Sequence, residues 1–153
     1  MIAVIRVRGT AHVTRKIRET LSMMRLFKSN HMVLLAENKS QQKMIDKVKD
    51  YVTFGQITQD TLAMVLEKRG RLEGDKLLTT DYLKEKKMEG FAGLAKELIE
   101  GKTKMQALGI KPVFRLNPPS KGYERNGVKK PFTLGGALGN RREKINVLIG
   151  RMS

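Results

Sequence analysis

The residues with the clearest chemical potential lie in the stretch GGALGNRREKINVLIG, from Gly135 to Gly150. Three glycines within its first five positions let the backbone approach a phosphate closely, because glycine has no Cβ atom. Arg141, Arg142 and Lys144 follow, and their side chains donate charge-assisted hydrogen bonds to phosphate oxygens. The stretch therefore predicts a phosphate-binding loop, for either a mononucleotide or a nucleic-acid backbone.

The spacing of these residues disfavours a mononucleotide site. A P-loop ends in Lys-Ser or Lys-Thr, because the lysine reaches the outer phosphates and the hydroxyl binds magnesium, whereas Gly139 precedes Asn140 and Arg141 here. The dinucleotide pattern G-x-G-x-x-G also fails, since Gly135 and Gly136 are adjacent. A loop that binds the phosphates of a nucleic-acid backbone is favoured. The alternatives are a surface turn beside a terminal strand and a small nucleotide-dependent enzyme acting on RNA.

The remaining polar residues predict neither catalysis nor metal binding. The chain has no cysteine, and His12 and His31 alone cannot form a dense imidazole cluster. Asp46 and Asp50 are one helical turn apart, but lysines at ion-pairing spacing accompany them, which is typical of a solvated helix face. We therefore expect no enzymatic activity, no cofactor, no metal site and no small-molecule substrate.

Positive charge dominates the composition. The 153 residues include 31 Lys and Arg against 15 Asp and Glu, a net charge of +16. Residues 1–57 carry 11 basic and 4 acidic side chains, residues 58–110 carry 10 and 9, and residues 111–153 carry 10 and 2. Two basic ends around a balanced middle predict specific contact surfaces for a polyanion, and nucleic acid is the commonest such partner.

The first half of the basic N-terminal part predicts a strand and a helix. Apolar residues alternate along residues 3–8, which indicates a strand whose second face turns basic at Arg6 and Arg8 and could rest on RNA. Apolar residues then recur at helical spacing from Val13 to Met24, with the arginines of this segment on the opposite side. One helix is thus expected to offer a core face and an arginine face.

Two more strands and a helix complete this part. The segment HMVLLAEN, residues 31–38, is typical of a buried strand, and Ser40 is expected to begin a second helix. TFGQI, residues 53–57, predicts a third strand. The resulting order, β-α-β-α-β over residues 1–57, indicates an α+β unit.

The middle part, residues 58–110, predicts helices that contain 9 of the 15 acidic side chains. Thr58 is a plausible N-cap of a helix that stops near Gly70, and Thr80 is expected to start a short charged helix. The segment FAGLAKELIEGK predicts another helix, with Gly101 just past its end. We expect these helices to be the solvent-facing part of the protein.

The last part, residues 111–153, predicts an extended basic loop followed by a strand. Residues 111–132 contain all four prolines of the chain, and only Val113 to Leu116 is strand-like. In KINVLI, residues 144–149, apolar side chains alternate, which predicts a terminal strand paired with residues 113–116. We expect the three parts to form one folded unit.

The mode of nucleic-acid binding follows from the scarcity of aromatic residues. Because most aromatic side chains fall at apolar helix or strand positions, phosphate and shape recognition of folded RNA is favoured over base stacking. A DNA-binding protein that places its arginine-faced helix in a major groove is the alternative, although no helix-turn-helix pair is recognisable. The apolar runs are far shorter than the ~20 residues needed to cross a bilayer. A cytoplasmic location without membrane contact is expected.

The sequence resembles a known protein family over essentially the whole chain. The segments IRVRG, RKIRETLSMMRL and HMVLLAEN, joined to PPSKGYE and KKPFTLGGALGNRREKINVLIGRM, resemble the archaeal form of the large-subunit ribosomal protein family L-thirty, whose eukaryotic counterpart is called L-seven. The N-terminal segments correspond to the short bacterial core. GGALGNR is the more specific motif, and it belongs to the longer archaeal and eukaryotic members.

The resemblance implies a non-enzymatic ribosomal protein with a small ferredoxin-like α+β core and a helical, basic C-terminal extension. It also implies contact with 23S rRNA, proximity to 5S rRNA, and neighbouring large-subunit proteins as partners. Basic side chains would neutralise phosphates and orient the protein, with little base readout. The residues expected to contact rRNA are Arg6, Arg8, Arg15, Arg18, Arg25, Lys28, Arg115, Lys121, Arg125, Lys129, Lys130, Gly135, Gly136, Gly139, Asn140, Arg141, Arg142 and Lys144.

Overall fold

A central strand near the N-terminus organises the sheet. The computed structural model describes residues 1–86, 88 and 90–153. Its sheet has the strand order β4-β2-β1-β3-β5, and β1 (Ile2–Arg6) pairs antiparallel with both β2 (His31–Leu35) and β3 (Val52–Gln56). The edges come from the end of the chain: β4 (Val113–Arg115) pairs antiparallel with β2, and β5 (Gly139–Asn140) pairs parallel with β3.

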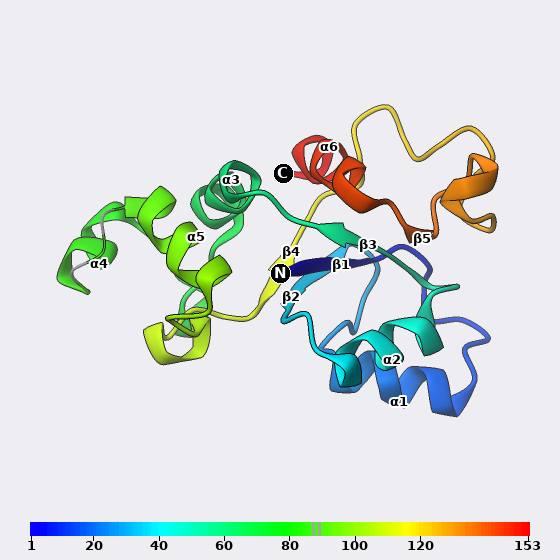
Figure 1. The fold of residues 1–153 in the computed structure, drawn as a ribbon, viewed down its shortest axis with the longest axis horizontal. Helices are drawn as coiled ribbons and strands as arrows, with labels where there is room; N and C mark the ends of the chain where they lie inside the picture. Colours follow the sequence, from blue (N-terminus) through cyan, green and yellow to red (C-terminus); the bar gives the residue numbers. More distant parts are fainter. Residues whose placement is uncertain (87, 89) are drawn as a thin grey trace.

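One face of this sheet is covered by two helices, α1 (Arg15–Met23) and α2 (Lys39–Val48), as Figure 1 shows. Because successive strand residues point to opposite faces, Ile2, Val4 and Val33 all point toward these helices. They pack there against Leu21 of α1 and Ile45 of α2. The order β1-α1-β2-α2-β3 and the mixed α+β class are as the sequence predicts.

The opposite face of the sheet carries α3 (Gln59–Arg69) and α6 (Ile145–Met152) (Figure 1). Leu66 of α3 and Ile149 of α6 belong to the same buried cluster as Ile5 and Phe114 of the sheet. This core therefore unites side chains from all three compositional parts of the chain. The prediction that one face of β1 turns basic and rests on RNA is wrong, because helices cover both faces and all five residues of β1 are buried.

The helices expected in residues 58–110 are present. Thr58 lies at the N-cap of α3, and Gly70 at its C-cap. α4 (Thr80–Glu85) and α5 (Gly90–Glu100) follow, and Figure 1 shows them at one end of the molecule, away from the sheet. α5 packs against α3 through a cluster that includes Leu94 and Leu98. Short 3₁₀ turns complete the structure at Glu73–Asp75, Met105–Leu108, Phe132–Leu134 and Arg142–Lys144.

The expected terminal strand at residues 144–149 is instead the helix α6. Alternation of Ile145, Val147 and Ile149 suggested a strand, but Val147 is 68% exposed in the structure. Ile145, Leu148, Ile149 and Met152 are all buried, and their i, i+3, i+4, i+7 spacing is that of one helix face. The expected pairing with residues 113–116 is also wrong, because β4 lies against β2.

No helix in residues 1–86, 88 and 90–153 has both the length and the apolar character that crossing a bilayer requires.

Candidate nucleic-acid interface

Arg6, one of the predicted phosphate contacts, lies inside the protein. At the end of β1 it is only 3% exposed, and every nitrogen of its guanidinium donates to a backbone carbonyl. Nη1 donates to the oxygens of Leu26 (2.7 Å) and Phe27 (3.0 Å), Nη2 donates to Gly9 (2.8 Å), and Nε donates to Arg8 (2.9 Å). Burial lowers the pKa of Arg6 from its ordinary value. Arg6 therefore joins the loop after β1 to the loop after α1.

The outer face of α1 and the turn after it carry the basic residues that the sequence placed there. Arg15 and Arg18 are exposed along the helix, and Arg25 and Lys28 are exposed in the turn. Arg15 forms an exposed ion pair with Glu19 at 2.7 Å, and such pairs contribute little to stability. These four cations are therefore accessible to a polyanion. Arg8, just after β1, lies 4.8 Å from the centre of the Tyr51 ring.

Arg25 follows α1 in an unusual backbone conformation. Its φ of 60° lies in the left-handed region, and its N–H donates to Ser22 O at 2.8 Å while the N–H of Leu26 donates to Leu21 O at 2.8 Å. These two bonds form a Schellman motif, whose left-handed position is normally glycine because a Cβ there costs about 1–2 kcal/mol. An arginine thus occupies a position that favours glycine.

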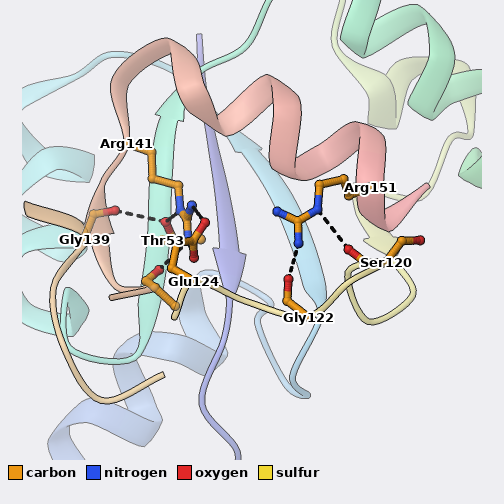
Figure 2. Close-up of polar contacts among 8 residues, drawn as sticks. Thr53, Ser120, Gly122, Glu124, Gly139, Arg141 and Arg151 are labelled. Atoms are coloured by element: carbon orange, nitrogen blue, oxygen red, sulfur yellow. Dashed lines mark hydrogen bonds and ion pairs between the residues drawn. The ribbon is translucent and has the colours of Figure 1, made fainter. Parts of the chain in front are cut away.

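Arg141, in the glycine-rich stretch, is also buried. Its side chain is 2% exposed and forms a two-pronged ion pair with Glu124, whose side chain is 22% exposed. Nε donates to Thr53 Oγ1 at 2.8 Å, and Nη2 also donates to Ala137 O at 3.1 Å. The guanidinium lies 4.6 Å from the centre of the Phe132 ring. Figure 2 shows Arg141 between Thr53 on β3 and Glu124 on the loop.

The charge of Glu124 is maintained by this contact. Burial alone would raise its pKa, but hydrogen bonds from Arg141 and the positive charges of Arg141 and Arg151 outweigh burial and lower the pKa. Next to it, burial raises the pKa of Tyr123, whose hydroxyl donates to Asn30 Oδ1 at 3.0 Å. Both residues therefore attach the loop after β4 to the body of the protein.

Arg151 holds the same loop from α6. Its Nε donates to Ser120 O at 3.0 Å and its Nη2 donates to Gly122 O, as Figure 2 shows. Neither Arg151 nor Glu124 is among the residues expected from the sequence to form the interface. One signal was available for Glu124: it is one of two carboxylates among 10 basic residues in 111–153, a setting in which an internal ion pair is expected.

Gly136 of the stretch and Gly55 of β3 have internal structural roles. A Cβ on Gly136 would lie 2.1 Å from Lys130 O, so only glycine allows the loop to fold back on itself there. On β3, a Cβ on Gly55 would lie 2.1 Å from Arg142 O, where the 3₁₀ turn crosses the sheet. Close approach of backbone segments within the protein thus accounts for glycine at these positions.

The other predicted contact residues of the C-terminal part are solvent-accessible. Arg142 and Lys144 lie in the 3₁₀ turn before α6, and the N–H of Arg142 donates to Asn140 Oδ1 at 2.8 Å. Arg115 lies 3.5 Å from Asp75. The remaining exposed cations of the loop after β4 are Lys121, Arg125, Lys129 and Lys130.

The surroundings of the glycine-rich stretch differ from those of a nucleotide site. A hollow of about 1250 Å³ beside it is lined by both signs of charge, with Asp46 and Glu143 near Arg142 and Lys144. A helix, α6, does follow the three glycines where a strand was expected, but the Lys-Ser or Lys-Thr pair of a P-loop is missing. Within residues 1–86, 88 and 90–153, no three His, Asp or Glu side chains are grouped as a metal site would need.

Comparison with known proteins decides the family. The family model described as ribosomal protein L30p/L7e matches residues 2–52. Large ribosomal subunit protein uL30 of Nanoarchaeum equitans (strain Kin4-M) is 50% identical over 151 residues, covering 99% of this chain and 97% of that protein. The chain belongs to the ribosomal protein L30p/L7e family. The uL30 proteins of Methanococcus maripaludis (strain C5) and Methanosphaera stadtmanae are 50% and 41% identical, over 98% and 99% of this chain.

Membership in the L30p/L7e family confirms the resemblance seen in the sequence, including its archaeal form. The relatives are ribosomal proteins of the large subunit, and the expectation of a ribosomal protein that is not an enzyme is confirmed. The similarity also extends past the α+β core, since the full-length relatives align through the glycine-rich stretch and α6. Residue-level contacts with rRNA stay predictions.

Proposed function

We propose that this L30p/L7e family member binds and stabilises folded 23S rRNA near 5S rRNA, through phosphate contacts of exposed basic side chains. The observation that carries this proposal is the arrangement of the charge. Figure 1 shows the loop after β1 and the long loop between β4 and β5 at the end of the molecule opposite α4 and α5. The two basic parts, far apart in sequence, thus gather away from the charge-balanced helices.

Direct contacts between the two basic parts support a common surface. Val7, just after β1, packs with Ala137 and Leu138 of the glycine-rich stretch. Tyr123 adds a hydrogen bond from the C-terminal loop to Asn30, in the loop before β2. These contacts place both loops in a fixed relation before any RNA is bound, so that ordering them costs little entropy on binding.

The proposed contacts are the predicted basic residues whose side chains reach solvent. Arg6 and Arg141 receive a different role, since a phosphate would have to break their internal hydrogen bonds; they position the loops that carry the other cations. Contacts to phosphates fix orientation and carry little sequence information. The proposed phosphate-binding residues are Arg8, Arg15, Arg18, Arg25, Lys28, Arg115, Lys121, Arg125, Lys129, Lys130, Arg142 and Lys144.

Lysine acetylation of the intact large subunit tests this surface. We expect Lys28, Lys129 and Lys144 to be protected in the subunit and modified in the free protein, because RNA covers them. Lys84, on α4, and Lys96, on α5, are the matched exposed controls from the charge-balanced end. Equal modification of the two sets in the subunit would contradict the proposal.

Titration of the free protein with 23S rRNA, 5S rRNA and duplex DNA ranks the partners by affinity. A preference for duplex DNA would also contradict the proposal.

A further inference from the structure

A hollow of about 490 Å³ lies between the loop after β1 and the C-terminal end of α1. Arginine, hydroxyl and aromatic side chains come together in its wall, and no carboxylate contributes to it. This distinguishes it from the larger hollow beside the glycine-rich stretch, which both signs of charge line. Its lining residues are Arg6, Thr10, Val13, Arg18, Ser22, Leu26 and Phe27.

Buried hydrogen bonds hold the two walls of the hollow in place. Arg6 donates to Gly9 O in the loop after β1, and to the oxygens of Leu26 and Phe27 after α1. Because the guanidinium is rigid and planar, these bonds set the separation of the two loops. The hollow is therefore preformed in the free protein.

The turn after α1 places an aromatic ring in the wall of this hollow. In the Schellman motif at Arg25, the residue after the left-handed position packs back on the helix, and Leu26 is accordingly 0% exposed. The next residue, Phe27, is left 53% exposed. Burial of apolar surface contributes about 25 cal/mol per Å², so a ring that keeps half of its surface in water contributes less to folding than a fully buried ring would.

An exposed ring beside arginine matches the chemistry of one ligand class. Unpaired RNA bases stack on aromatic side chains, while guanidinium groups bind the adjoining phosphates. The hydroxyls of Thr10 and Ser22 in the same wall can donate to and accept from base edges. The net charge of +16 and the absence of a carboxylate from the wall favour a polyanionic ligand over a partner protein, whose carboxylates could also pair with Arg18.

We propose that this hollow binds a single unpaired nucleotide of the rRNA, with its base stacked on Phe27 and its phosphate bound by Arg18. This inference rests on the proposed rRNA binding and adds a base contact to the phosphate contacts. Arg6 is a positioning residue for the hollow, since its donors are occupied by backbone carbonyls. Stacking makes the contact tolerant of base identity.

Tryptophan fluorescence tests the stacking directly, because the chain contains no tryptophan. In Phe27→Trp, we expect 23S rRNA to quench the emission strongly, since a stacked base deactivates the indole. Leu77→Trp is the control, at a residue of similar exposure, 52%, that lies outside the basic parts. Emission of Phe27→Trp that changes no more than that of Leu77→Trp on saturation with rRNA would overturn the stacking.

Affinity measurements separate this inference from the proposed function. Phe27→Ala should weaken binding of 23S rRNA by about 5- to 150-fold, the range for removal of one stacked base, while Phe27→Tyr stays within about 2-fold. Thermal unfolding checks that both variants fold. If the wild-type protein binds rRNA and Phe27→Ala binds equally well, the hollow does not hold a nucleotide and a protein occupant is indicated. If the wild-type protein does not bind rRNA, the proposed function itself fails.

Discussion

The guanidinium of Arg141 forms a two-pronged ion pair with Glu124, 17 residues earlier in the chain, and its Nε binds Thr53 on β3. Arg141 is thereby linked to the loop through Glu124 and to the sheet through Thr53. One of the arginines that the sequence predicts to bind phosphate therefore has a structural role inside the protein.

Removal of Arg141 should destabilise the protein strongly. In Arg141→Ala, Glu124 keeps its charge and its partial burial but loses its ion-pair partner. The free energy of unfolding should fall by about 3 kcal/mol, the low end of the range for broken buried pairs, because Glu124 is partly exposed. Urea unfolding measures this difference. The control is Arg142→Ala at the neighbouring exposed position, which should lower the free energy of unfolding by less than about 0.5 kcal/mol. Equal effects of the two variants would argue against the structural role.

The same pair predicts a pH dependence of stability. The folded protein holds the pKa of Glu124 below 4.5, its ordinary value, so the unfolded chain binds the proton more readily. The contribution of the pair is therefore complete above pH 4.5 and is lost as the pH falls through the folded-state pKa. Unfolding temperatures of the wild-type protein and Glu124→Gln should accordingly converge at acid pH. Glu143→Gln, at an exposed carboxylate, should show no such convergence with the wild type.

Arg25 should separate stability from RNA binding. Because its φ of 60° favours glycine, Arg25→Gly should leave the unfolding free energy unchanged or raise it by up to about 1 kcal/mol. The same change removes a cation, so affinity for 23S rRNA should fall. Arg25→Lys, which keeps the charge, is the matched variant for binding. If Arg25→Gly gains stability and keeps full affinity for rRNA, the charge of Arg25 does not contribute to RNA binding.

The salt dependence of binding should reveal whether the 3₁₀ turn before α6 binds phosphates. Combined Arg142→Ala and Lys144→Ala should flatten the slope of log affinity against log salt by up to about 0.9 for each phosphate that the variant no longer neutralises. Lys84→Ala with Lys96→Ala, at the charge-balanced end, removes the same charge and should leave the slope unchanged. An unchanged slope in the first pair would exclude Arg142 and Lys144 from phosphate binding.

Local sequence patterns identify most of the helices and strands that the sequence predicts correctly. The strand β1 and the helix α1 repeat their apolar residues at a single period, and the unbroken apolar run of β2 is typical of a buried strand, so neighbours along the chain suffice to identify them. In residues 144–149, Ile145 and Ile149 fit both the two-residue period of a strand and the i, i+4 spacing of a helix, and the segment is too short to decide between the two. Leu148 and Met152 decide for a helix, because the core that they enter is made by α3 and the sheet.

By itself, the sequence determined the mixed α+β class, the positive charge of the two ends and the family of the protein. It could not determine which of the arginines reach solvent. That depends on contacts across the fold: the carbonyls that surround Arg6 come from loops on both sides of α1, and the partners of Arg141 lie 88 and 17 residues away. An arginine side chain binds a carbonyl, a carboxylate and a phosphate through the same donors, so only the tertiary structure, by bringing those acceptors within reach, separates the structural arginines from those left free for RNA.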